Sequence, residues 1–371
     1  MTPRQISESL HLRVRRFIEA SIDLVPTEPF ADLARDIARF QVAHVPAFAR
    51  YVRARKVDIE RIEHPHAIPA LPCDVFRLAR VAAHEPSEDQ RIFRTSGTSQ
   101  GNEARGEHPM RTTDTYALAA VGWGQHMLWP DHRRFDVLVL APSASEVPDS
   151  SLSFMIEEFV QKVGEQGKYL FGKNGLDVDG LERAIGDAEF LGRSVLVLGT
   201  SFAFVHLIDR GGGRHLRLPP GSRLMQTGGF KGRSREVSPE ELRRQMVTIF
   251  GLPETHVVSE YGMTELSSQL YESTLAGALG FGEPGKHGVY LAPPWLSVAA
   301  ADPVTLEALP AGETGILRFV DLANVDSAVA IQTMDLGRVT RDGVELLGRA
   351  PGAMVRGCSL AVEELFMQGS S

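Results

Sequence analysis

Between residues 91 and 280, short apolar runs alternate with longer segments of helical periodicity. Three runs, at 136–141, 194–199 and 256–259, have the composition of buried strands. Parallel neighbours need a crossover connection, which is usually a helix. The alternation therefore predicts an α/β fold with a largely parallel sheet.

The intervening segments carry clear helix signals. Apolar side chains recur at helical spacing over 152–163. Ser238 precedes Pro239, and Glu241 follows three residues after Ser238, which is the pattern of a capping box. Gly251 is expected to end the helix that begins there.

The two ends of the chain differ from this middle part. The first ninety residues have mostly helical patterns, with Pro46 expected to end or kink the helix over 30–52. After Gly280 the sequence has short β-rich runs separated by Gly and Pro. We therefore expect four parts: a mainly helical segment packed on the core (1–90), an α/β core (91–280), a β-rich subdomain of the same core (281–349) and a short tail (350–371).

Charge and cysteine content exclude several classes of function. The net charge of −8 does not favour nucleic acid as the main partner. Two cysteines, Cys73 and Cys358, cannot form a disulfide framework and fit a reducing compartment. The N-terminus has no signal-peptide pattern, and the most apolar stretch, 194–208, is too short to span a bilayer. We expect a cytoplasmic protein without a membrane span.

A first candidate site is the small-residue loop at 95–101, which follows a predicted strand at 91–93. Glycines interleaved with Ser and Thr allow a phosphate to approach the backbone and supply N–H and O–H donors. The loop is not a Walker A motif, because it lacks the Gly-Lys-Ser/Thr ending. A surface Ser/Thr/Gly loop explains the same residues.

A second candidate site is the segment 259–265, directly after the predicted strand at 256–259. The carboxyl ends of parallel strands are where open α/β sheets bind ligands. Tyr261 offers a flat face for a base, and Thr264 and Glu265 offer oxygens for a phosphate and Mg²⁺. A polar turn with one structural tyrosine is the alternative.

A third candidate site is the series of turns at 334–349. The carboxylate of Asp335 can accept hydrogen bonds from both hydroxyls of a ribose. Asp342-Gly343 is also an ordinary hairpin signal, so a plain β-meander explains the segment equally well.

Taken together and in this order, the three segments resemble the adenylate-forming (ANL) superfamily of acid–CoA ligases and related enzymes. Thr227-Gly228-Gly229, Gly312–Gly315 and Gly348-Arg349 add to the likeness. The resemblance implies an ANL-type adenylating domain with mixed, mostly parallel sheets that binds ATP or AMP and Mg²⁺, with Glu265 as the metal ligand. It implies these nucleotide-binding residues: Thr95, Ser96, Gly97, Thr98, Ser99, Gly101, Gly228, Gly229, Glu260, Tyr261, Gly262, Asp335 and Arg349.

Within that superfamily the sequence is similar to the LuxE-like acyl-protein synthetases, over 198–209, 227–236, 260–271 and 355–365. This resemblance implies that a fatty acid is activated as acyl-AMP and loaded on a C-terminal cysteine, for delivery to an acyl reductase. By position that cysteine is Cys358. Arg356 and a predicted helix start at Ser359 would lower the pKa of its thiol. Cys73, in an apolar run, is expected to be structural.

Two departures from the superfamily pattern matter. The phosphate loop has no lysine after Gly101, and Arg105 is the nearest cation. The superfamily's mobile C-terminal domain and its catalytic lysine have no expected counterpart after Arg349. Lys231 is the internal substitute that we nominate beside Thr264, Glu265 and Cys358, although a solvated loop lysine is the alternative.

Two other functions stay open at this point. One is an adenylating ligase for a non-fatty acid in a specialised pathway, such as phenazine or antibiotic synthesis. The other is a nucleotide-binding or scaffold protein without catalysis. The expected acyl pocket draws on aromatic and apolar residues that core packing explains equally well: Phe202, Phe204, Phe230, Leu270 and Tyr271.

Overall fold

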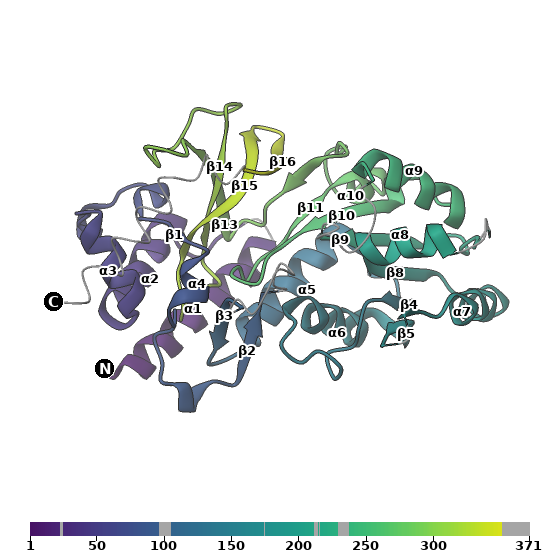
Figure 1. The fold of residues 1–371 in the computed structure, drawn as a ribbon, viewed down its shortest axis with the longest axis horizontal. Helices are drawn as coiled ribbons and strands as arrows, with labels where there is room; N and C mark the ends of the chain where they lie inside the picture. The colour runs from purple at the N-terminus through teal and green to yellow at the C-terminus, as the bar shows by residue number, and fades with distance from the viewer. Residues whose placement is uncertain are drawn as a thin grey trace.

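The computed structural model describes residues 1–22, 25–95, 105–173, 175–210, 214, 216–228 and 237–350. Its largest unit is a twelve-stranded sheet that runs through the described part of the chain (Figure 1). The helices are α1 (Pro3–Ile22), α2 (Phe30–His44), α3 (Pro46–Ala54), α4 (Val75–Leu78), α5 (Asp114–Leu128), α6 (Ser151–Val163), α7 (Val178–Phe190), α8 (Ser201–Arg210), α9 (Pro239–Phe250) and α10 (Thr274–Ala278), with short 3₁₀ turns η1 (Ile59–Arg61), η2 (Pro65–Ala67), η3 (Pro86–Glu88) and η4 (Glu254–His256).

One half of the sheet is parallel, in the order β5-β4-β8-β9-β10. These strands are β4 (Phe135–Leu140), β5 (Gly164–Tyr169), β8 (Val195–Thr200), β9 (Arg223–Thr227) and β10 (Val257–Tyr261). β4, β8 and β10 confirm the three strands that the apolar runs predict. The α/β class is therefore confirmed.

The other half of the sheet is antiparallel, in the order β11-β12-β16-β15-β14-β13, and β1 adds to β15 in parallel. Its strands are β1 (Leu71–Pro72), β11 (Leu270–Glu272), β12 (Val289–Leu291), β13 (Leu296–Ala301), β14 (Thr314–Asp321), β15 (Ala330–Thr340) and β16 (Gly343–Arg349). Two separate hairpins pair β2 (Arg91–Arg94) with β3 (Glu107–Met110) and β6 (Phe171–Gly172) with β7 (Gly175–Leu176). β1 joins the N-terminal segment to the sheet.

Side chains of the parallel strands alternate between two cores. On β4, Val137 and Val139 belong to the core that contains α5 and α6, whereas Leu138 and Leu140 belong to the core of α7, α8 and α9. Successive residues of a strand point to opposite faces, so fully apolar strands are what a sheet with helices on both faces requires. Fully burying each such side chain contributes about 1.5–3 kcal/mol.

The helix signals are also found where the sequence places them. α2 ends at His44, and Pro46 begins α3, so Pro46 separates two helices. The Ser238 hydroxyl accepts from the Glu241 N–H at the start of α9, and Gly251 ends the helix with φ +62°. The side chain of Glu241 bonds to Arg244 and Gln245 rather than back to Ser238, so half of the capping box forms.

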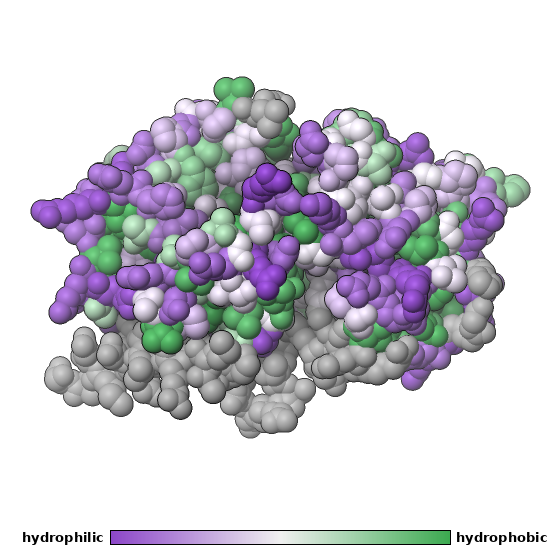
Figure 2. Space-filling model, turned by 90° about the horizontal axis from the view of Figure 1, so that it is seen from above, coloured by the Kyte–Doolittle hydropathy of each residue, from purple (hydrophilic) through white to green (hydrophobic). Residues whose placement is uncertain are grey.

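The N-terminal helices and α7 lie at opposite ends of the molecule. α1, α2 and α3 lie beside β13, β14 and β15 at one end, and α7 lies at the opposite end (Figure 1). Outside its grey atoms, the face in Figure 2 is mostly hydrophilic with small separate apolar groups. In the described residues, no helix combines the length and apolarity needed to cross a membrane. The four-part division of the chain stays a prediction.

Candidate active site

Two neighbouring parallel strands end side by side at the predicted nucleotide site. Thr227 at the end of β9 is in register with Glu260 of β10, and its hydroxyl donates to Glu260 Oε2. Gly228 follows with φ +72°, a conformation that favours glycine. Nothing in the described part of the chain lies within 4 Å of where its Cβ would be.

Glu260 is a buried carboxyl near the end of β10. In the described residues Thr227 is its hydrogen-bond partner, and the Cβ of any residue replacing Gly262 would lie 2.6 Å from Glu260 Oε1. Burial raises the pKa of Glu260 to about 7, and the Thr227 bond offsets this in part.

The side chains of Tyr261, Asp335 and Arg349 meet from three different strands. The Tyr261 hydroxyl donates to Asp335 Oδ2 at 2.7 Å, and Arg349 Nε lies 3.5 Å from Asp335 Oδ1. Asp335 of β15 pairs with Arg349 of β16, and the register shifts immediately afterwards, at Leu336 and Gly337. β-bulges commonly re-aim side chains beside active sites. The three predicted residues thus form one cluster.

The ring of Tyr261 is held on one face. It stacks on Phe319 of β14 with centroids 6.0 Å apart and planes 24° from parallel. Burial raises the pKa of Tyr261 well above its ordinary value, and the nearby charges of Asp335, Cys73 and Glu265 act in the same direction. Because Phe319 occupies one face, a base would have to stack on the other.

Thr264 and Glu265 are held through their backbone carbonyls. His108 on β3 bonds to the Thr264 carbonyl at 2.7 Å, and the Asn324 amide donates to the Glu265 carbonyl at 2.8 Å. Both anchors come from distant parts of the chain. The backbone of the Tyr261–Glu265 segment is therefore fixed by residues outside the motif.

Glu265 suits a magnesium ion in one specific way. Among the described residues, no group of three His, Cys, Asp or Glu side chains could hold a metal by itself. Mg²⁺ is commonly bound by one or two carboxylates together with substrate phosphates. In such an arrangement the carboxylate of Glu265 would supply the protein's ligand, and ATP and water would supply the others.

Thr95 lies at the neck of the predicted phosphate loop. Its N–H donates to the Gly106 carbonyl, and its hydroxyl accepts from the Gly106 N–H, both at 2.9 Å. Arg105 bonds to the carbonyls of Thr95 and Arg94 and to Asp149. Arg105, the nearest cation to the loop, therefore stabilises the base of the loop through these contacts.

The remaining predicted site residues lie outside the described residues: Ser96, Gly97, Thr98, Ser99, Gly101, Gly229, Lys231 and Cys358. The motifs did not single out Thr227 as a partner of Glu260, nor His108 and Asn324 as anchors. No local pattern marks His108 and Asn324, because their partners are backbone carbonyls far away in the sequence.

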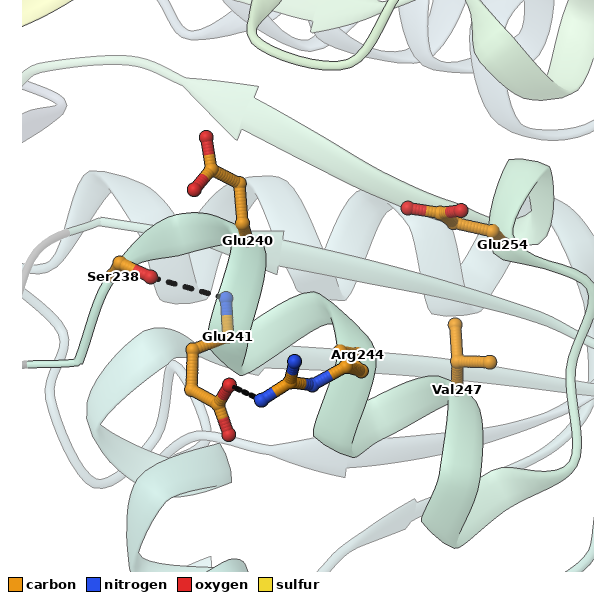
Figure 3. A pocket seen from close by; sticks show the side chains of 6 residues that line it. All are labelled: Ser238, Glu240, Glu241, Arg244, Val247 and Glu254. Atoms are coloured by element: carbon orange, nitrogen blue, oxygen red, sulfur yellow. Dashed lines mark hydrogen bonds and ion pairs between the residues drawn. The ribbon is translucent and has the colours of Figure 1, made fainter.

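The expected acyl pocket is wrong as a single pocket. Tyr271 belongs to the core on the α5–α6 face of the sheet, whereas Phe204 packs against Phe250 in the core on the other face. A surface hollow of about 500 Å³ lies elsewhere, on α9 (Figure 3). Carboxylates dominate its lining, which consists of Ser238, Glu240, Glu241, Arg244, Val247 and Glu254. None of the predicted nucleotide-binding residues that the structure describes lines this hollow.

Comparison with solved structures identifies the fold. The chain resembles 2-hydroxyisobutyryl-CoA ligase in complex with 2-HIB-AMP, with a TM-score of 0.63 and 14% identity over 86% of this chain and 67% of that one. It also resembles ATP-bound MatB from Rhodopseudomonas palustris, with a TM-score of 0.52 and 16% identity over 72% of this chain. It spans about half of the MatB chain, 49%. The fold is that of the adenylate-forming ligases.

Sequence comparison narrows this class. The family model for acyl-protein synthetase, LuxE, matches residues 33–367, so the chain belongs to that family and is an acid-activating ligase. A long-chain-fatty-acid–luciferin-component ligase of Vibrio harveyi is 22% identical over 326 residues, which are 83% of this chain and 80% of the relative.

Proposed function

We propose that the protein activates a long-chain fatty acid with ATP and transfers the acyl group to the thiol of Cys358. Membership of the acyl-protein synthetase family and the name of the Vibrio harveyi relative support the choice of acid. The observation that carries the proposal is the meeting of Tyr261, Asp335 and Arg349 at the end of β10, the strand next to β9.

The nucleotide would lie across this cluster. Adenine stacks on the face of Tyr261 opposite Phe319, near the end of β9. A carboxylate has about four lone-pair positions, so Asp335 can accept from ribose hydroxyls while it keeps the Tyr261 bond. Residues 95–101 would surround the phosphates.

The first step joins the two substrates. A carboxylate oxygen of the acid attacks the α-phosphorus of ATP, the bond to the β-phosphate oxygen breaks, and pyrophosphate leaves. Both reactants are anions, so donors from the loop and from Thr264 must neutralise charge. Magnesium held by Glu265 and the phosphates would add Lewis-acid stabilisation of the charge that develops on phosphate oxygens.

The second step transfers the acyl group. The Cys358 thiolate attacks the acyl carbonyl carbon, the bond to the AMP oxygen breaks, and AMP leaves with its electron pair. The product is a thioester on the chain itself, ready for an acyl reductase or another acceptor protein. Thiolates are strong nucleophiles near neutral pH, which suits this transfer.

Acid-dependent pyrophosphate exchange tests the first step. The protein is incubated with ATP, Mg²⁺ and labelled pyrophosphate in the presence of fatty acids from eight to eighteen carbons, aromatic acids or no acid. We expect exchange with long-chain acids. Exchange confined to aromatic or other non-fatty acids favours the specialised-pathway ligase, and ATP binding without exchange favours a non-catalytic protein.

Labelling with a radioactive fatty acid tests the second step, and the chain offers a matched pair of thiols. Cys73 is the informative rival because its backbone N–H donates to the carbonyl of Gln332 on β15, the strand that carries Asp335. We expect hydroxylamine-labile label on the parent and on Cys73→Ser, and none on Cys358→Ser. If the label survives in Cys358→Ser but disappears in Cys73→Ser, the acyl acceptor is Cys73 and our proposal is wrong.

A further inference from the structure

His108 joins two parts of the site that are far apart in the sequence. It lies on β3, the strand that leaves the predicted phosphate loop, and is paired with Phe93 of β2. Its side chain is 1% exposed and contacts the Tyr261–Glu265 segment, the turn before β15 and α4.

The partners of the ring fix its tautomer. The Thr264 carbonyl can only accept, so Nδ1 of His108 carries the proton and donates at 2.7 Å. In the neutral ring Nε2 is then an acceptor, and the Ser327 hydroxyl donates to it at 2.9 Å. The edge of the ring also packs against Phe76 of α4, with centroids 5.5 Å apart and planes at 72°.

The electrostatic setting of His108 favours that neutral form. Burial lowers the pKa of His108 to about 4, and the hydrogen bond to Thr264 offsets this in part. The ring therefore keeps one donor and one acceptor across the neutral pH range. Its role does not depend on a change of charge.

The reaction makes such a junction useful. The phosphate loop and the Thr264–Glu265 pair must act on the same ATP molecule, and displacement by about 1 Å can cost two orders of magnitude in rate. Groups that position a reacting site work best when packing and hydrogen bonds lock them. His108 is locked on both nitrogens and by Phe76.

We propose that His108 is a positioning residue, which sets the phosphate loop's exit strand against Thr264 and Glu265 and thereby sets the geometry of ATP binding. This inference rests on the proposed adenylating function. It predicts an effect on the use of ATP rather than on the binding of the acid.

The experiment compares two replacements of His108 in pyrophosphate exchange. In His108→Leu both hydrogen bonds are lost, so kcat/KM for ATP falls by about 10- to 100-fold while KM for the acid stays within about twofold. In His108→Asn the amide nitrogen occupies nearly the place of Nδ1 and can donate to the Thr264 carbonyl. We expect this variant to recover most of the lost kcat/KM.

The matched control is His66, another histidine whose pKa burial lowers to about 4. It bonds to Ser297 on β13 at 2.8 Å rather than to a site segment. His66 is half-buried, and His66→Leu should leave both kcat/KM for ATP and KM for the acid unchanged. Ser327→Ala keeps the hydrogen bond between His108 and Thr264, so its kcat/KM for ATP should stay within about threefold of the parent value.

Several results would overturn the inference. KM for ATP and for the acid could rise together in His108→Leu, His108→Asn could be as impaired as His108→Leu, or His66→Leu could show the same ATP defect. If the parent shows no exchange with any acid, the proposed function fails, and the affinity for a fluorescent ATP analogue becomes the readout. Weaker binding by His108→Leu but not His66→Leu then supports positioning, and equal binding refutes it.

Discussion

Two buried carboxyl groups, close together on adjacent strands, have opposite surroundings. Both oxygens of Glu272 on β11 are engaged, by Arg243 at 2.7 Å and the Gly288 N–H at 2.6 Å on one side and the Ser259 N–H at 3.0 Å on the other. Glu260 on β10 has Thr227 as its hydrogen-bond partner among the described residues.

The pKa values follow this difference. Burial raises the pKa of both groups, but contacts with His287, Arg243 and two backbone N–H groups outweigh it at Glu272 and bring the pKa below its usual value. At Glu260 the effect of burial exceeds that of the Thr227 hydrogen bond, so the pKa is raised. Glu272 is thus a completed structural contact between α9 and the sheet, whereas the described residues give Glu260 one hydrogen-bond partner at the end of β10. We expect this difference if Glu260 belongs to the nucleotide site and Glu272 to the structural core.

Removing the cation of the completed pair should have the largest effect. Arg243→Met leaves the Glu272 charge buried without its partner, and we expect a loss of about 3–5 kcal/mol in the free energy of unfolding. Urea denaturation measures it. The exposed neighbour Arg244, paired with Glu241, is the matched control, and Arg244→Met should change stability by about 0.5 kcal/mol or less. Equal losses in the two variants would show that the buried Arg243–Glu272 pair contributes no more to stability than the exposed Arg244–Glu241 pair.

Glu260 should give a pH-dependent effect. Its pKa in the folded chain is about 7, against a usual value of 4.5, so the folded state holds a proton that the unfolded state releases. This contribution to stability is complete below pH 4.5 and is lost as the pH rises through 7. Its full size is about 3 kcal/mol.

The variant Glu260→Gln keeps an acceptor for Thr227 and cannot ionise. We expect the parent to lose stability relative to Glu260→Gln between pH 5 and pH 8.5, as measured by urea denaturation at each pH. The exposed Glu240→Gln serves as the control and should follow the parent. Parallel pH profiles for the parent and Glu260→Gln would mean that Glu260 is charged in the fold.

Asp335 should affect ATP rather than stability. In Asp335→Asn the ribose loses a charged acceptor, and KM for ATP should rise by about 10- to 100-fold, because hydrogen bonds to charged groups contribute about 1.5–3 kcal/mol. The side chain is partly exposed, so the melting temperature should change little. Asp342→Asn, which removes an exposed partner of Lys286, should leave both quantities unchanged. A large loss of stability without a change in KM would make Asp335 structural.

Much of the fold was predictable because its signals are local. The apolar runs that form β4, β8 and β10 are buried on both faces, so their composition alone marks them. β5 was not predictable in the same way, since its sequence GEQGKY is polar and it lies at the edge of the sheet. The pairing of β1 with β15 depends on residues about 260 positions apart, which no local pattern encodes.

The site divides in the same way. Tyr261 and Asp335 belong to motifs with fixed spacing, and the structure brings their side chains together. His108 acts through the carbonyl of Thr264, 156 residues away, and any residue type supplies a carbonyl. The sequence therefore marks residues that belong to local motifs better than residues that hold those motifs in place.

Arg349 gives the smallest predicted effect and the finest test of the comparison. It is mostly exposed and 3.5 Å from Asp335, so as an ion pair it contributes about 0–1 kcal/mol to stability. Arg338, also exposed and paired with Glu345 at 3.8 Å in the same pair of strands, is its matched control. Arg349→Gln and Arg338→Gln should therefore have the same melting temperature within experimental error. If Arg349 belongs to the nucleotide site, its variant alone should raise KM for ATP, by about fivefold, which corresponds to about 1 kcal/mol. An equal response of KM in both variants would place Arg349 with the structural ion pairs and leave Asp335 and Tyr261 as the site's contribution from this end of the sheet.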